Sequence, residues 1–229
     1  MSPKTILWIA LVSTATAAAV EMPLSVSDIV PGTPGHVRLT NTSRQPVTAW
    51  SLATTQSSNG RTHREVHTAD GYLSEATHGI QGTAERLERL MPQQSRVIQL
   101  DPLPQDATVE IVAVVLDDGT AIGEESAIAP IFERRARERD ALTAVAAVFS
   151  DVLSSQHGTA ALDSLKQRLV ALPARDEVPC RAAIDAVDTY RQRGGARTPD
   201  QIDESLRTYA AFVGREAELA KQHAQRKNR

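Results

Sequence analysis

The chain has 229 residues, of which 41% are apolar and 23% are charged, and its formal net charge is -3. This length suffices for one large domain or two small ones, each with its own core, and the composition excludes an intrinsically disordered chain. Only eight residues are aromatic. Such scarcity weighs against surfaces that work by stacking, such as sugar-binding platforms or grooves for single-stranded nucleic acid.

The first residues have the pattern of an export signal. Lys4 supplies a positive charge, residues 6–12 are apolar, and the alanines at 17–19 fit the small-residue rule of signal-peptidase cleavage. We expect residues 1–19 to be a signal peptide and the rest to be exported, either periplasmic or secreted. An anchor that stays uncleaved is the alternative, although the apolar run is shorter than the roughly 20 residues of a spanning helix. No later segment is apolar enough to span, so we expect no stable membrane span after cleavage.

Charge and glycine content divide the rest of the chain into two units. Residues 20–130 carry 7 Arg and no Lys against 14 Asp and Glu, whereas residues 131–229 carry 17 Lys and Arg against 14 Asp and Glu. Most glycines fall in the first unit, and the second has long helical runs. This asymmetry predicts an α+β chain, with a β-sandwich domain over residues 20–127 and a helical region over residues 128–229.

The predicted strands of the first unit are short and separated by turn residues. Alternating residues predict strands at 36–40 and 46–52, with turn chemistry at 41–45 between them. A third strand is predicted at 96–100, and residues 24–30 allow an edge strand.

Residues 108–116 form the strongest predicted strand. Their β-branched side chains are dense enough for a central strand covered on both faces. The turn residues 117–120 then predict a hairpin into a last short strand. About five to seven such strands predict an antiparallel immunoglobulin-like β-sandwich, with Trp50 as its central core aromatic.

The segment from residue 56 to residue 94 gives no clear pattern. Residues 84–91 have helical spacing at Leu87, Leu90 and Met91, but they are equally compatible with part of a strand pair. A loop of this length is either functional or contains regular elements that the pattern does not reveal.

The second unit predicts about four helices. Apolar stripes indicate helices at 130–156, 162–172 and 179–193, and a capping box at 198–201 opens a fourth. The polar tail 221–229 is expected to fray. The first helix carries arginines interleaved with acidic residues, namely Arg134, Arg135, Arg137 and Arg139 among Glu133, Glu138 and Asp140. We expect this run to be a solvated helix face, and nucleic acid not to be a partner.

One group of side chains points to chemistry. On a strand His63, Glu65 and His67 would share a face, and two imidazoles with a carboxylate can hold a divalent metal. The alternative is a polar loop or edge strand exposed to water. Further candidate ligands are His36, Asp70 and His78.

Other catalytic signatures are absent from the sequence. It contains no Gly-x-Ser-x-Gly and no phosphate-binding glycine loop, so we predict neither a catalytic residue nor a cofactor. The single cysteine, Cys180, lies on a predicted helix and is expected to be a buried, inert thiol. Asn41, with Thr42 and Ser43, matches a glycosylation acceptor.

Two stretches, residues 41–50 and 114–123, resemble a group of uncharacterised exported bacterial proteins. In that group a strand, an Asn-x-Ser turn and a second strand are followed later by a hydrophobic strand that ends in Asp-Gly-Thr. The resemblance covers about residues 35–155. It implies an immunoglobulin-like sandwich and export, and it offers no catalytic residues to transfer.

These observations favour an exported, non-enzymatic protein that binds another exported protein or an envelope component through its sandwich or its helices. A metal-dependent enzyme or metal-binding protein centred on His63, Glu65 and His67 is the alternative. A third hypothesis is an oligomeric structural protein assembled through apolar helix faces. The sequence leaves the oligomeric state open.

Overall fold

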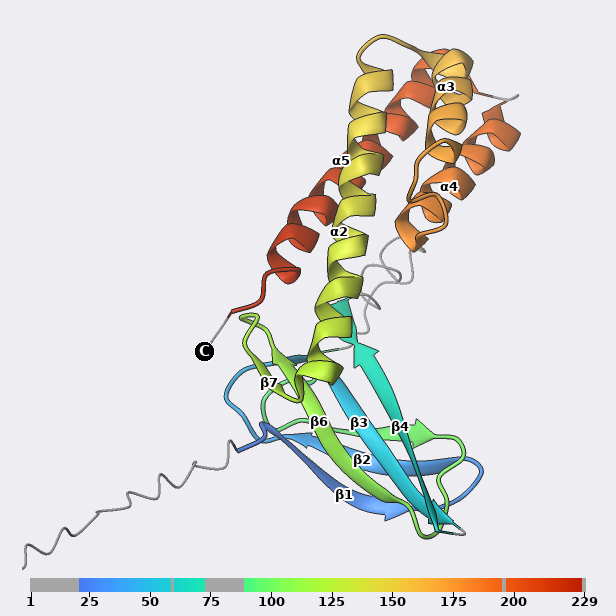
Figure 1. The fold of residues 1–229 in the computed structure, drawn as a ribbon. Coiled ribbons are helices and arrows are strands. Elements are labelled where there is room, and N and C mark those ends of the chain that lie inside the picture. The colour runs from blue at the N-terminus through green and yellow to red at the C-terminus, as the bar shows by residue number, and fades with distance from the viewer. Residues whose placement is uncertain (1–20, 59, 73–88, 195–196, 228–229) are drawn as a thin grey trace, which may run out of the picture.

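Figure 1 shows the computed structural model, which describes residues 21–58, 60–72, 89–194 and 197–227. The described chain is α+β, because two antiparallel sheets are followed by four helices. The expected signal peptide lies outside the described residues. None of the described helices is both long enough and apolar enough to cross a membrane.

The strands form two sheets of unequal size. The three-stranded sheet has the order β1-β2-β5, with β1 at Leu24–Val30, β2 at Gly35–Asn41 and β5 at Ser95–Leu100. The four-stranded sheet has the order β4-β3-β6-β7, with β3 at Val47–Ser58, β4 at Arg61–Asp70, β6 at Thr108–Leu116 and β7 at Ala121–Gly123. The predicted strands at 36–40, 46–52, 96–100 and 108–116, the edge strand at 24–30 and the hairpin at 117–120 are therefore confirmed.

An apolar core lies between the two sheets. Val37 and Leu39 of β2 meet Trp50 and Leu52 of β3 and Val114 of β6, and all five side chains are buried. Trp50 is thus a core residue, as the sequence predicts. Burial of such side chains is the main stabilising contribution to a sandwich of this kind.

The outer face of the four-stranded sheet is covered by the start of α2, which spans Glu125–Leu153. Ala127 and Ile128 pack on Ala53 and Ala113, where small side chains let the helix approach the sheet closely. Strands β3 and β6 are therefore covered on both faces, which confirms the expectation for β6. The helix begins five residues before the expected start at Pro130, because its first turn gains this contact with the sheet.

The rest of α2 packs with α3 (Gly158–Val170), α4 (Val178–Gly194) and α5 (Pro199–His223) around a second core. The predicted capping box at the start of α5 is present. Cys180 is buried in this core, and burial raises the pKa of its thiol, as expected for an inert cysteine. Large buried side chains of the second core include Phe149, Leu162, Leu165, Leu169 and Leu206.

The structure decides one open question and corrects one expectation at the edges of the fold. The segment without a clear pattern does contain a regular element, β4, which pairs with β3 along its whole length. The polar tail does not fray at residue 221, because α5 continues to His223 and the chain then returns to the β6–β7 hairpin (Figure 1). There the amide of Lys227 donates to the carbonyl of Gly119 at 3.0 Å.

Candidate functional site

The predicted metal-binding residues lie together on β4. His63, Glu65 and His67 alternate along the strand and therefore share a face, as the sequence predicts. Glu65 Oε2 lies 3.9 Å from His67 Nε2, and Thr54 Oγ1 lies 3.5 Å from the same nitrogen. This face is solvent-accessible, since His63 and Glu65 are exposed and His67 is half-buried.

The additional ligands expected for a metal are not brought to this face. His36 lies on β2 of the other sheet, and Asp70 is buried in an ion pair with Arg135. His78 lies outside the described residues. Within those residues no group of three or more His, Cys, Asp or Glu side chains is placed to hold a metal ion. Metal binding by His63, Glu65 and His67 therefore stays a prediction.

The densest polar contacts lie where the sandwich meets the helices, around Arg135 of α2. Its Nε donates to Asp70 Oδ2 at 2.7 Å and its Nη2 donates to Asp70 Oδ1 at 2.9 Å, a two-point ion pair. The same guanidinium donates to Thr48 Oγ1 at 3.2 Å and to the backbone carbonyl of His223 at 3.3 Å. One side chain thus ties β3, β4 and the end of α5 to α2.

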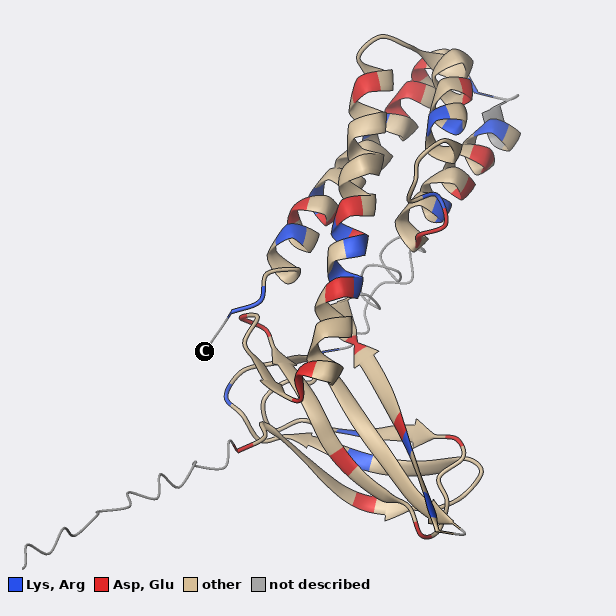
Figure 2. Cartoon of the chain, viewed as in Figure 1, with Lys and Arg blue, Asp and Glu red and all other residues tan. Residues whose placement is uncertain are grey.

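The expectation of a solvated face is wrong for Arg135, whose side chain is only 2% exposed. It continues the spacing of Ile128, Ile131 and Leu142, so it lies on the side of α2 that faces the protein. That spacing is the signal in the sequence that could have identified it. Figure 2 shows acidic and basic residues following one another along this part of α2.

Tyr72 and His223 stack beside this ion pair. Their ring centroids are 3.5 Å apart with an interplanar angle of 6°, and the Tyr72 hydroxyl donates to Asp117 Oδ1 at 2.8 Å. Burial, together with the positive charges of Arg135 and Arg89, lowers the pKa of His223 to about 4. Burial also raises the pKa of Tyr72, so both rings are neutral at neutral pH.

A polar hollow of about 320 Å³ opens next to the stacked rings. Its wall is lined by Tyr72, Arg89, Asp117, Asp118, Gln222, His223, Gln225 and Lys227. Arg89 pairs with Asp117 at 3.3 Å, and Lys227 lies 3.6 Å from Asp118. The charged side chains of this wall therefore pair with one another. The hollow lies at the contact between the sandwich and the C-terminal tail.

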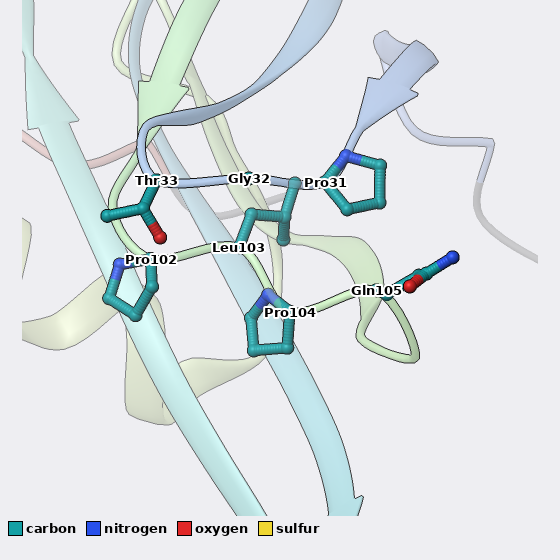
Figure 3. Close-up of a pocket in the computed structure, with 7 residues that line it drawn as sticks. All are labelled: Pro31, Gly32, Thr33, Pro102, Leu103, Pro104 and Gln105. Atoms are coloured by element: carbon teal, nitrogen blue, oxygen red, sulfur yellow. The ribbon is translucent and has the colours of Figure 1, made fainter.

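A second hollow, of about 370 Å³, is lined by prolines and Leu103 together with polar groups of Thr33 and Gln105 (Figure 3). Pro31 and Thr33 of the β1–β2 turn face Pro102 and Pro104 of the β5–β6 loop across Leu103. Two backbone hydrogen bonds between Gly32 and Leu103, of 2.9 and 3.0 Å, join the two loops. Sequence reasoning missed this site, although the closely spaced prolines at residues 31, 34, 102 and 104 mark it.

The walls of this proline-lined hollow are fixed by packing. Leu103 is buried beneath it, and Gly35 is required there because a Cβ atom at this position would lie 2.3 Å from Cβ of Leu103. Beside the hollow, the end of β1 exposes two large apolar side chains, with Ile29 45% and Val30 43% exposed. The result is a proline-rich surface whose two loops are held in place by packing and hydrogen bonds, with exposed apolar side chains next to it.

The predicted glycosylation acceptor has a structural role in the folded chain. Asn41 is fully buried, and its Nδ2 donates to the carbonyls of Gln45 and Leu90, both at 2.8 Å. Its Oδ1 accepts from the amide and the hydroxyl of Ser43 at 2.9 and 2.7 Å. Because this amide is buried and fully hydrogen-bonded, it cannot carry a glycan in this fold.

Comparison with known proteins adds no relative: no family model, no curated protein and no solved structure matches the chain.

Proposed function

We propose that the chain is an exported, non-enzymatic protein whose immunoglobulin-like β-sandwich binds a protein partner of the cell envelope. The observation that carries the proposal is the proline-lined hollow, whose two loops are held together by hydrogen bonds and flanked by exposed apolar side chains. The leader pattern of residues 1–19 supports export. The resemblance over about residues 35–155 agrees with both the sandwich class and export.

The strand connections support the immunoglobulin-like class. The chain crosses between the two sheets from β2 to β3, from β4 to β5 and from β5 to β6. The hairpins β1–β2, β3–β4 and β6–β7 each stay within one sheet. Two antiparallel sheets joined by such crossing connections are typical of this class, whose loops gather at the two ends of the sandwich.

The hollow lies at the end of the sandwich away from the helices. Strand β6 ends at the junction beside Asp117, so its first residue, Thr108, lies at the opposite end together with the β5–β6 loop. Loops held by a rigid scaffold are common binding surfaces. The helices therefore leave this end of the sandwich open to a partner.

Proline walls favour binding for an entropic reason. A proline ring fixes its own φ, so Pro31, Pro102 and Pro104 lose little conformational freedom when a partner covers them. The hollow has the volume of a small binding pocket, and Ile29 and Val30 add exposed apolar surface next to its prolines. We therefore propose that the partner inserts an apolar side chain from an extended segment.

Site-specific photo-crosslinking in intact cells tests this proposal. A photo-reactive amino acid at Thr33, in the hollow, should capture one envelope protein. The same amino acid at Val170, an exposed position on α3, should not capture it. Pro104→Glu should then abolish the product at Thr33 without changing the amount of soluble protein. Identical products from both positions, or no product at Thr33, would refute the proposal.

A further inference from the structure

Strand β4 is the longest edge strand among the described residues. It forms one edge of the four-stranded sheet, has ten residues in unbroken register with β3, and exposes its first six residues. The other edges in the described residues are shorter or interrupted. The register of β1 is broken between Ser27 and Val30, β5 has six residues, and β7 has three. Interrupted or short edges are the usual protection against strand addition.

The sequence of β4 is self-complementary in one antiparallel register. With Val66 opposite Val66 of a second copy, Glu65 of each copy lies opposite His67 of the other. The same register places Arg64 opposite Thr68, and no two like charges face each other directly. Cross-strand pairs of opposite charge and of β-branched residues stabilise antiparallel sheets.

Neighbouring registers lack this match. A two-fold axis at Arg64 places the two Arg64 side chains opposite each other, and an axis at Glu65 does the same for Glu65. On the other side, an axis at His67 places the two His67 side chains opposite each other and Glu65 opposite Ala69, so the Glu65–His67 pairs are lost. Like charges directly opposite each other destabilise a strand pair, which leaves the Val66 register favoured.

We propose that a second copy of this chain pairs with the outer edge of β4 in antiparallel orientation, centred on Val66. Val66 is 43% exposed and gains a partner of its own kind. Glu65 and His67, which lie 3.9 Å apart within one copy, each gain an opposite partner from the second copy. The proposal is independent of the proline-lined hollow, because the hollow is formed by other loops.

The helices leave room for this dimer. Helix α2 packs over Ala53 and Ala113, which belong to β3 and β6, and it reaches β4 at Asp70. Glu65 and Val66, at the proposed axis, remain exposed. In Figure 1 the Asp70 end of β4 points towards the helices. An antiparallel partner therefore directs its own helices to the opposite end, and the dimer is an eight-stranded sheet with a helical unit at each end.

Sedimentation of the purified protein from about 1 to 200 μM tests the proposal, because interfaces of this small area give weak, reversible dimers. The unmodified protein should show a monomer–dimer equilibrium. His67→Glu places Glu opposite Glu twice and should raise the dimer dissociation constant by at least about tenfold. The double variant Glu65→His/His67→Glu restores opposite partners and should recover most of the lost affinity.

Two matched variants complete the design. Val66→Arg should abolish the dimer, whereas Val97→Arg, at a position on β5 that is 52% exposed, should leave it unchanged. Thermal melting of each variant checks that the monomer remains folded. A monomer at every concentration would overturn the proposal, as would a dimer that is insensitive to Val66→Arg. Failure of the double variant to recover affinity would refute the register.

Discussion

At the scale of single residues, Arg135 is the most consequential side chain of the fold. It is buried together with Asp70, and a buried charge without its partner is costly. Arg135→Met should therefore lower the free energy of unfolding by about 3–5 kcal/mol, as measured by urea denaturation. The double variant Arg135→Met/Asp70→Leu should recover a large part of this loss. A cost below about 1 kcal/mol for the single variant would contradict the structural role of the pair.

Glu138 gives the protein a pH dependence that can be measured. Burial and the nearby Asp70 carboxylate raise the pKa of Glu138 to about 7, above the ordinary value of 4.5. The native state therefore binds this proton more tightly than the unfolded chain does. The resulting stabilisation is fully present below about pH 4.5 and is lost as the pH rises through 7.

Glu138→Gln removes the charge that burial disfavours. Relative to the unmodified protein, this variant should gain about 2 kcal/mol in the free energy of unfolding at pH 8. The gain should shrink towards pH 5, where the native carboxyl is already protonated. Glu133→Gln, at an exposed position of the same helix, serves as the control and should show no such trend. A gain of equal size at both pH values would contradict the assignment.

At the scale of secondary structure, the sequence predicts those elements that bury apolar side chains at a regular spacing. Strand β6 and the helices are predicted for this reason, and the capping box marks the start of α5. Strand β4 is not predicted, because all of its first six residues are exposed and its register is imposed by pairing with β3. Long-range pairing of this kind leaves no local pattern.

The candidate sites follow the same logic. The shared face of His63, Glu65 and His67 can be deduced from alternation alone, whereas the burial of Arg135 depends on segments that are distant in sequence. The proline-lined hollow requires two loops, around residues 32 and 103, to meet. Tertiary contacts of this kind are not encoded in local spacing.

The returning tail after α5 should contribute modestly to stability. Arg226 donates two hydrogen bonds to the Glu125 carboxylate, at 2.6 and 2.7 Å. The amide of Lys227 donates to the carbonyl of Gly119 in the β6–β7 hairpin. A chain that ends at Ala224 loses these contacts and should be only slightly less stable, since exposed ion pairs contribute little. Hydrogen exchange of the hairpin amides should accelerate in the shortened chain. Unchanged exchange there would show that the tail does not hold the hairpin.

At the scale of the whole molecule, the two cores should unfold together. Helix α2 contributes Ile128 to the contact with the sheet and Phe149 to the helical core, so loss of one unit exposes part of the other. In a chain that begins at Val20, Trp50 is the single tryptophan and reports on the sandwich through fluorescence, while circular dichroism at 222 nm reports on the helices. The two signals should show the same urea midpoint. Separate midpoints would mean that the units are independent.

Export makes a prediction about the mature protein. If residues 1–19 are a cleaved leader, protein recovered from the envelope or the medium should begin at Val20. Mass spectrometry of the intact protein measures this directly. Replacing the alanines at 17 and 19 by bulky residues should cause the precursor to accumulate. An unprocessed chain in the envelope would support the anchor alternative.

The continuity of α2 has a practical consequence for anyone who works with parts of this protein. A cut between the sandwich and the helices at residue 127 falls inside α2, before Ile131, whose burial against Ala49 and Val115 covers the outer face of the sheet. A sandwich expressed alone would present that bare face to water, and the isolated helices would carry Arg135 without Asp70. The two halves are therefore not interchangeable modules, and a fusion or domain exchange has to carry α2 together with both of its contact surfaces.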